Sequence, residues 1–207
     1  MQDNNSQKEN ICLPHEQEAR STFRIHCSDW EARLIGAFAK DTRLQSVLEY
    51  GDDFSEHIAS LCFRKPVQNL SQEEIELGSV LAKSGSLGYD SGYMAQVFAF
   101  SPSQARSLLN EYYAVFYKSR RWIKSYAKGE AQRIIEEKKN SILEANLAKS
   151  RKNCPKGWDY LGEMSFSVPW YAYERNVEKW FRHHFEAEIE IEGTLVKLPI
   201  EIVRMPS

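Results

Sequence analysis

Two patterns of apolar and polar positions follow one another near the start of the chain. Residues 22–27 (TFRIHC) alternate with a period of two, which predicts a short β-strand. Residues 30–48 follow the helical period, and their apolar face is formed by Trp30, Leu34, Ala37 and Phe38. Residues 1–21 are polar and offer little to bury, so we expect them to form a flexible tail.

The segment at residues 70–98 (LSQEEIELGSVLAKSGSLGYDSGYMAQVF) organises the middle of the chain. Its apolar residues recur at helical spacing, and Ser71 followed by Glu74 is the capping-box pattern that begins a helix. Lys83 lies within this helix, and three glycines crowd its end, at Gly85, Gly88 and Gly92. Because each glycine costs a helix about 1 kcal/mol relative to alanine, the helix either ends there or lets another group approach its backbone.

Residues 112–152 are predicted to be helical and become increasingly basic. The basic residues are Lys118, Arg120, Arg121, Lys124, Lys128 and Arg133, interleaved with Tyr113, Phe116, Tyr117, Trp122 and Tyr126. Such a mixture can follow a nucleic-acid backbone and stack on bases. The helical spacing favours the alternative, in which the aromatic residues face the core and the cations face water. Residues 134–148, which include Lys139, are interpreted as a solvated face.

The C-terminal third is predicted to contain a loop, an aromatic helix and a β-hairpin, in that order. Proline and glycine place the loop at residues 150–158. Residues 168–184 are dense in aromatic side chains and are expected in the core or at a subunit contact. Residues 185–203 alternate around Glu192-Gly193, which predicts a hairpin with a third strand after it.

Length and composition narrow the class of protein. A chain of 207 residues can form one domain with a real core or two small ones. Its formal net charge is -2, so any basic surface must be local. The widely spaced cysteines predict free thiols rather than disulfides or a zinc site. Without a signal segment or a long apolar run, we expect a cytoplasmic protein that does not span a membrane.

The glycine-rich helix at residues 70–98 resembles the fingers helix of family A DNA polymerases, the family of bacterial DNA polymerase I. That motif reads Arg-x3-Lys-x3-Phe-Gly-x2-Tyr-Gly. The lysine and both glycines are matched by Lys83, Gly88 and Gly92. The arginine, phenylalanine and tyrosine positions are occupied by Ser79, Leu87 and Ser91. The resemblance implies that Lys83 holds nucleotide phosphates and that Leu87 and Ser91 contact the nucleotide.

The early strand and helix resemble the first catalytic motif of the same family. There a strand delivers an aspartate, and a Glu-x-Arg triplet follows. The matching residues here are Glu31-Ala32-Arg33, followed by Gly51, Asp53 and Ala59. A later segment, which begins at Ser101, resembles the family's next helix, so the match covers residues 23–126. The resemblance implies that Glu31 and Arg33 shape the nucleotide pocket.

Polymerisation in this family needs carboxylates from the first and third motifs to hold two metal ions about 3.5–4 Å apart. An ungapped alignment places His26 at the position of the family's first-motif aspartate and keeps the strand in register. A gapped alignment places Asp29 there, as the catalytic and metal-binding residue. The third motif, His-Asp-Glu, sits at a tight turn between two palm strands, and the nearest candidate is His184-Phe185-Glu186. We expect Mg²⁺ as a cofactor only if the chain is active.

The expected fold is α+β and predominantly helical, like a truncated and degenerate polymerase palm and fingers. We expect a tail at residues 1–21 and one domain at residues 22–207. Within the domain, residues 22–66 form the first-motif strand and helix, residues 70–148 the fingers-like helices, and residues 150–207 the aromatic helix and the hairpin. Palm strands need one another to bury one face, so the early strand is expected to pair with the hairpin.

Two functions from different classes remain open. One is a nucleotidyltransferase fragment in DNA replication or repair, which is template-directed only when a companion polymerase chain completes it. The other is a catalytically inactive relative that binds nucleic acid or a replication protein. In both, the expected partners are a nucleotide and DNA, as primer-template or single strand. The candidate contacts to nucleic acid are Arg120, Arg121, Lys124 and Lys128. A phage-encoded or nucleoid-associated protein fits either function, and an unrelated helical protein is the third alternative.

Overall fold

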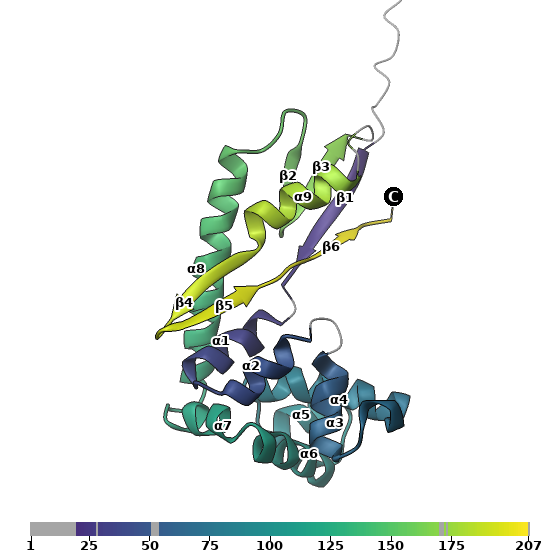
Figure 1. The fold of residues 1–207 in the computed structure, drawn as a ribbon, viewed down its shortest axis with the longest axis vertical. Coiled ribbons are helices and arrows are strands. Elements are labelled where there is room, and N and C mark those ends of the chain that lie inside the picture. The colour runs from purple at the N-terminus through teal and green to yellow at the C-terminus, as the bar shows by residue number, and fades with distance from the viewer. Residues whose placement is uncertain (1–19, 28, 51–53, 170–171, 173, 207) are drawn as a thin grey trace, which may run out of the picture.

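The computed structural model describes residues 20–27, 29–50, 54–169, 172 and 174–206. Within them the fold is predominantly helical, with a smaller share of antiparallel strand, as expected (Figure 1). The helices are α1 (Trp30–Phe38), α2 (Thr42–Leu48), α3 (Phe54–Phe63), η2 (Val67–Asn69), α4 (Gln72–Ser86), α5 (Ser91–Val97), α6 (Pro102–Val115), α7 (Tyr117–Lys124), α8 (Glu130–Lys152) and α9 (Glu174–Phe185). The strands are β1 (Arg20–His26), β2 (Asp159–Gly162), β3 (Ser165–Pro169), β4 (Ala187–Ile191), β5 (Thr194–Leu198) and β6 (Glu201–Arg204).

Some features that the sequence predicted lie outside the described residues. They are residues 1–19 of the tail, Gly51 and Asp53 of the first-motif match, and Trp170, Tyr171 and Tyr173 of the aromatic segment. The tail therefore stays a prediction there. Its last residues, Arg20 and Ser21, belong to β1 instead.

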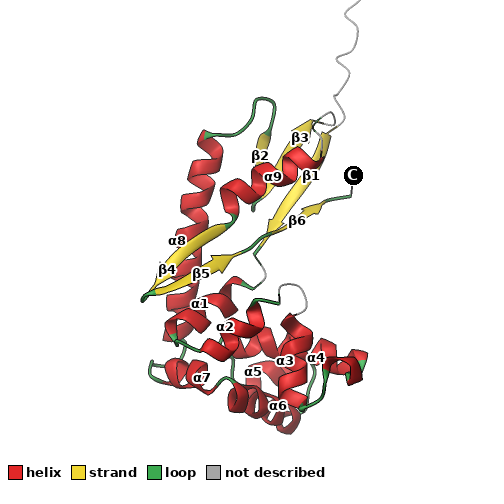
Figure 2. Cartoon of the chain, viewed as in Figure 1, coloured by secondary structure: helices red, strands yellow, loops and turns green. Residues whose placement is uncertain are grey.

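The main sheet is antiparallel, in the order β2-β3-β1-β6. Strand β1 confirms the strand that the sequence predicted near the start of the chain. Phe23 and Ile25 of β1 alternate with less buried residues and are buried themselves. Helix α9 lies across the sheet (Figure 2). Phe166 of β3 packs on Phe181 and Phe185 of α9, with ring centroids 5.1 and 5.9 Å apart. Aromatic contacts therefore hold the helix on the sheet.

The C-terminal hairpin is confirmed, but its expected pairing with the early strand is wrong. Strands β4 and β5 form a separate two-stranded sheet, with Glu192 and Gly193 in left-handed conformations at the turn (φ 47° and 81°). Both edges of β1 are occupied, by β3 and β6, so the hairpin has no edge to join. The chain bends at Pro199, which has no backbone N–H to donate to a neighbouring strand. Strand β6 follows this bend and pairs with β1 in place of the hairpin.

Residues 30–48 form two helices, α1 and α2, rather than the single helix expected. Lys40 adopts a left-handed conformation (φ 50°), and the Asp41 side chain accepts a hydrogen bond from the backbone N–H of Leu44 at 3.3 Å. A capping aspartate of this kind favours a new helix start over a continuous helix. Helix α1 is largely buried, because it packs against α2, α4, α7, α8 and β5.

Two glycines of the glycine-rich helix have different structural roles. Helix α4 begins with the expected capping box, in which Ser71 and Glu74 satisfy each other's backbone N–H groups. It ends before Gly88, whose φ of 67° favours glycine. Gly85 lies inside the helix, where a Cβ would be 2.1 Å from a ring carbon of Tyr112. Its backbone therefore packs directly against that buried ring.

A buried carboxylate joins the turn between α1 and α2 to α7. Asp41 is 3% exposed, and it accepts hydrogen bonds from the backbone N–H and the hydroxyl of Ser119 at 3.0 and 2.9 Å. Hydrogen bonds to an ionised group are stronger than those between neutral groups. Helix α7 is thereby held against the first helices, although these two residues are 78 positions apart.

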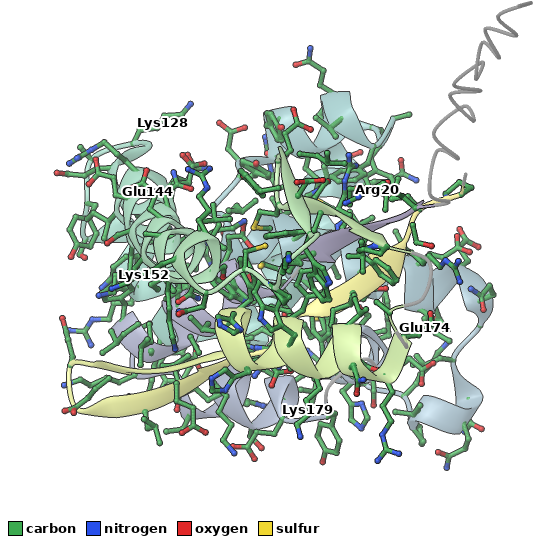
Figure 3. All side chains as sticks on the ribbon, turned by 90° about the horizontal axis from the view of Figure 1, so that it is seen from above. Arg20, Lys128, Glu144, Lys152, Glu174 and Lys179 are labelled. Atoms are coloured by element: carbon green, nitrogen blue, oxygen red, sulfur yellow. The ribbon has the colours of Figure 1, made fainter. Side chains whose placement is uncertain are left out.

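Charged side chains project outward around the long helix α8 and around α9. Seen from above, Lys128, Glu144 and Lys152 point away from the ribbon near α8, and Glu174 and Lys179 point away from α9 (Figure 3). Among the described residues, no helix combines the length and the apolar character needed to cross a membrane.

We expect Gly85→Ala to destabilise the fold by about 1–3 kcal/mol, the usual cost of overpacking. The added Cβ would overlap the ring of Tyr112, which is fully buried. Gly92→Ala is the matched control, because its Cβ would meet only Oδ1 of Asp90, at 3.3 Å. Alanine there should keep stability within about 1 kcal/mol of the original chain. Urea unfolding followed by circular dichroism measures both variants, and equal midpoints would contradict the tight packing at Gly85.

Candidate functional site

A cavity of about 460 Å³ lies where the end of β1 and the start of α1 meet α3, α4 and α8. We call it the α1–α4 cavity. Its chemically informative lining residues are Asp29, Glu31, Ser79, Lys83, Leu87 and Lys139. Five of them, Asp29, Glu31, Ser79, Lys83 and Leu87, come from the two polymerase-like motifs. The fold thus brings together residues that the sequence placed in one site.

Both carboxylates of the α1–α4 cavity are in ion pairs. Oδ2 of Asp29 accepts a hydrogen bond from Nε of Arg33 at 2.7 Å, and the two side chains are each 11% exposed. Glu31 is paired with Lys139, which reaches it from α8. Removing one member of a pair shielded from water leaves the other charge without compensation. These carboxylates are therefore held by fixed partners.

Lys139 is a site residue that the sequence analysis missed. It was assigned to a solvated face at residues 134–148, but its side chain is 24% exposed and contacts Glu31. The two residues are 108 positions apart. The neighbouring Lys138 has the same character in the sequence, so no local signal distinguishes the lysine that enters the cavity.

Lys83 has no ion pair with any described residue, and its side chain is exposed. It lies in the last turn of α4, where the helix dipole favours a positive charge. Ser79 lines the same cavity one turn earlier on α4. Because serine carries no charge, α4 does not supply the second cation that the motif would place at this position.

Cys27 lines the cavity as well, but its thiol is protonated at neutral pH. Burial raises the pKa of Cys27 to about 12, and the opposing effect of the nearby Lys139 is smaller. A thiol must lose its proton before it can act as a nucleophile or bind a metal. The chemistry of the cavity therefore depends on the lysines and the paired carboxylates.

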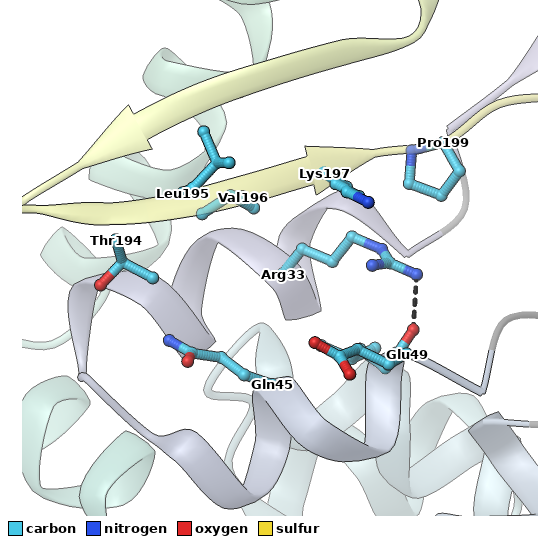
Figure 4. Close-up of a pocket in the computed structure, with 9 residues that line it drawn as sticks. Arg33, Gln45, Glu49, Thr194, Leu195, Val196, Lys197 and Pro199 are labelled. Atoms are coloured by element: carbon cyan, nitrogen blue, oxygen red, sulfur yellow. Dashed lines mark hydrogen bonds between the residues drawn. The ribbon is translucent and has the colours of Figure 1, made fainter.

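Two predicted nucleotide-binding residues line other cavities. Arg33 lines a cavity of about 660 Å³ beside α2 and β5. There its guanidinium donates a hydrogen bond to the carbonyl of Leu48 at 2.7 Å (Figure 4). Ser91 begins α5 and lines a cavity of about 280 Å³ that also includes Arg120 and Lys124. The chain turns between Leu87 and Ser91, and this turn separates positions that are close in the motif.

The third-motif candidate at residues 184–186 does not lie at a turn between strands. His184 and Phe185 belong to the last turn of α9, and Nδ1 of His184 is 2.8 Å from the carbonyl oxygen of Trp180. His184 is buried. The helical spacing of buried residues in α9 continues to Phe185. The segment therefore completes a helix and does not form a turn between strands. This candidate is therefore wrong.

The tight turn between two strands of the main sheet joins β2 to β3 and carries Glu163. Glu163 and Met164 have left-handed φ values of 46° and 57°. The carbonyl of Met164 accepts a hydrogen bond from the N–H of Ile25 at 3.1 Å, which places the turn beside β1. Glu163 is paired with Arg24 at 4.0 Å. The sequence analysis did not predict this turn, although Gly162 followed by a carboxylate and then by alternating residues is a local signal that could have indicated it.

The described residues do not fit the two-metal centre that the resemblance implies. Strand β1 ends at His26, so a histidine stands at the strand end, and Asp29 precedes α1 as its N-cap. This placement favours the ungapped alignment. Asp29 and Glu31 are paired with Arg33 and Lys139. Among the described residues, no group of three or more His, Cys, Asp or Glu side chains is placed to hold a metal ion.

Helix α7 divides its aromatic residues between the core and the surface. Phe116, just before the helix, is fully buried, and Trp122 stacks on Phe38 with ring centroids 5.4 Å apart. Tyr117, in contrast, is 61% exposed. Phe116 and Trp122 thus confirm the interpretation with inward-facing rings, whereas Tyr117 and Tyr126 are exposed. Nucleic-acid binding by this segment stays a prediction.

Tyr117 lines a shallow hollow of about 600 Å³ together with Arg120, Arg121 and Lys124. We call these four residues the α7 surface. Lys128, the remaining predicted contact to nucleic acid, lies beyond α7, and its Nζ is 3.0 Å from Oδ2 of Asp90. The fold thus groups three of the four predicted contacts around one exposed ring.

Comparison with known proteins finds no family model and no curated protein that matches the chain. Solved structures do match. One is the POL domain of Pol1 from M. smegmatis in complex with DNA primer-template and dNTP, with a TM-score of 0.64 at 14% identity. The match covers 91% of this chain and 40% of that chain, so this chain spans less than half of its neighbour. The likeness shows that the chain has a polymerase-like fold.

Proposed function

We propose that the chain is a polymerase-like protein that binds a nucleotide in the α1–α4 cavity and DNA on the α7 surface. The observation that carries the proposal is the meeting of Glu31, Lys83 and Leu87 in one cavity of a polymerase-like fold. Glu31 comes from one motif and the other two residues from a second, and only the tertiary fold unites the two motifs. The complex of the structural neighbour with primer-template and dNTP supports this choice of ligands.

The α1–α4 cavity offers two kinds of surface to a nucleotide. Lys83 provides an ammonium group, which acts as a point charge for phosphate. Ala82 and Leu87 provide apolar contacts for a base or a sugar. Ser79, in place of the motif's arginine, predicts weaker phosphate binding than a complete motif would give.

Replacement of Lys83 by alanine should weaken nucleotide binding by about 10- to 150-fold, the effect of losing one hydrogen bond to a charged group. Titration with a fluorescent deoxynucleoside triphosphate measures the dissociation constant. Ser79→Arg should have the opposite effect and tighten binding, because it adds a positive charge on α4 at the position of the motif's arginine.

Lys149→Ala is the matched control for this titration, because Lys149 is an exposed lysine of α8 outside the α1–α4 cavity. It should bind the nucleotide as the original chain does. Equal losses in Lys83→Ala and Lys149→Ala would contradict the proposed site, and so would an unchanged affinity in Lys83→Ala.

Template-directed synthesis by this chain requires, in our proposal, a companion chain that supplies the missing carboxylates. Asp29 is paired with Arg33, and Glu163 is exposed and paired with Arg24. Two-metal phosphoryl transfer needs carboxylates that converge on the same ions. The alternative of an inactive, DNA-binding relative has the same expectation for the isolated chain.

The purified chain with Mg²⁺ should therefore show no primer extension on a labelled primer-template. A DNA polymerase of known activity serves as the positive control in the same buffer. Extension by the chain alone that Asp29→Ala abolishes would restore Asp29 as a catalytic metal ligand and would refute this part of the proposal.

DNA binding should fall steeply between low and physiological salt. Each phosphate neutralised by a cation contributes a log–log slope of roughly -0.7 to -0.9. The double variant Arg120→Ala with Lys124→Ala should flatten this slope, whereas Lys83→Ala should leave it nearly unchanged. Fluorescence anisotropy at several salt concentrations measures the slope. Equal slopes in all three proteins would remove the α7 surface from the proposal.

A further inference from the structure

We infer that the α7 surface binds single-stranded DNA in preference to duplex DNA, with a base stacked on Tyr117. This inference rests on the proposed function and goes further by naming the form of DNA and the residue that selects it. It depends on three observations: an exposed aromatic ring, an uncompensated group of cations around it, and a shallow hollow that holds them together.

The ring of Tyr117 is available for stacking. It is 61% exposed at the start of α7. Within the part of the chain that the structure describes, neither its ring nor its hydroxyl has a ring contact or a hydrogen bond. Its neighbours differ, because Phe116 is buried and Trp122 stacks on Phe38. An aromatic ring left in water on a helix face lined by cations is the arrangement that binds unpaired bases.

The cations around Tyr117 are not compensated by nearby carboxylates. Arg121 and Lys124 follow Tyr117 at helical spacing, so all three lie on one face of α7. Neither cation has an ion pair among the described residues. The sequence between Glu111 and Glu130 contains no acidic residue. A positive surface of this kind attracts a polyanion.

Two arginines on other helices form ion pairs within their own helix. Arg133 of α8 is 2.6 Å from Glu137, and Arg182 of α9 is 2.9 Å from Glu178. Such pairs neutralise the positive charge within the same helix. The α7 surface therefore differs from these ordinary solvated helix faces.

A single strand matches this surface better than a duplex does. A duplex presents phosphates to a shallow surface while its bases remain stacked inside, so it can use only the cations. A single strand presents phosphates and unpaired bases together, and each base has a face that can stack on tyrosine. Helix α7 is about 12 Å long at 1.5 Å per residue. This length suits a short stretch of single strand.

The test compares a labelled single-stranded oligonucleotide with a blunt duplex of the same length by fluorescence anisotropy. The full chain should bind the single strand at least several-fold more tightly. Tyr117→Ala should weaken single-strand binding by about 5- to 150-fold, the range expected for the loss of one base–aromatic stack. It should change duplex binding little, and Tyr117→Phe, which keeps the ring, should bind the single strand normally.

Two controls separate stacking from a general loss of structure. Tyr50→Ala removes an equally exposed tyrosine, 57% exposed and outside α7, and should bind the single strand as the original chain does. An abasic strand keeps the phosphates without the bases, so the original chain and Tyr117→Ala should bind it equally. Equal affinity for duplex and single strand would overturn the inference, and so would an equal loss in Tyr117→Ala on the abasic strand. Either result leaves nucleotide binding and salt-dependent DNA binding intact, so the two proposals fail separately.

Discussion

The buried indole of Trp30 joins the start of α1 to the C-terminal strands. Its N–H donates a hydrogen bond to the carbonyl of Pro199 at 2.6 Å, at the bend between β5 and β6. The ring is fully buried, and a buried N–H without an acceptor would cost free energy, so α1 and the bend must keep this arrangement. Because α1 is held here, Asp29 and Glu31 line the α1–α4 cavity.

Ion pairing then decides what this cavity can bind. Asp29 and Glu31 are each engaged by a cation, Arg33 and Lys139, so the cavity does not present two free carboxylates. Of the two lysines that line the cavity, Lys83 is the one without an ion pair among the described residues. The balance of accessible charge therefore favours an anionic ligand over a metal ion, although both motifs contain acidic residues.

The buried carboxylate of Asp41 has a comparable effect on α7. It caps α2 through Leu44 and also accepts two hydrogen bonds from Ser119 in the middle of α7. This attachment buries one side of α7 and turns Tyr117 and Arg121 outward. The Asp41 carboxylate thus starts α2 as a separate helix and also orients the surface proposed to bind DNA.

The sequence by itself determined the features that depend on near neighbours along the chain. The capping box at Ser71, the helix end at Gly88 and the hairpin turn at Gly193 all involve residues a few positions apart, so local chemistry specifies them. The convergence of Glu31 and Lys83 was predicted through the family resemblance, not through local pattern. Only the tertiary structure decided the strands beside β1, the entry of Lys139 into the cavity and the separation of Ser91 from Lys83. These depend on contacts between residues far apart in the chain, and several arrangements are compatible with the same local periodicity.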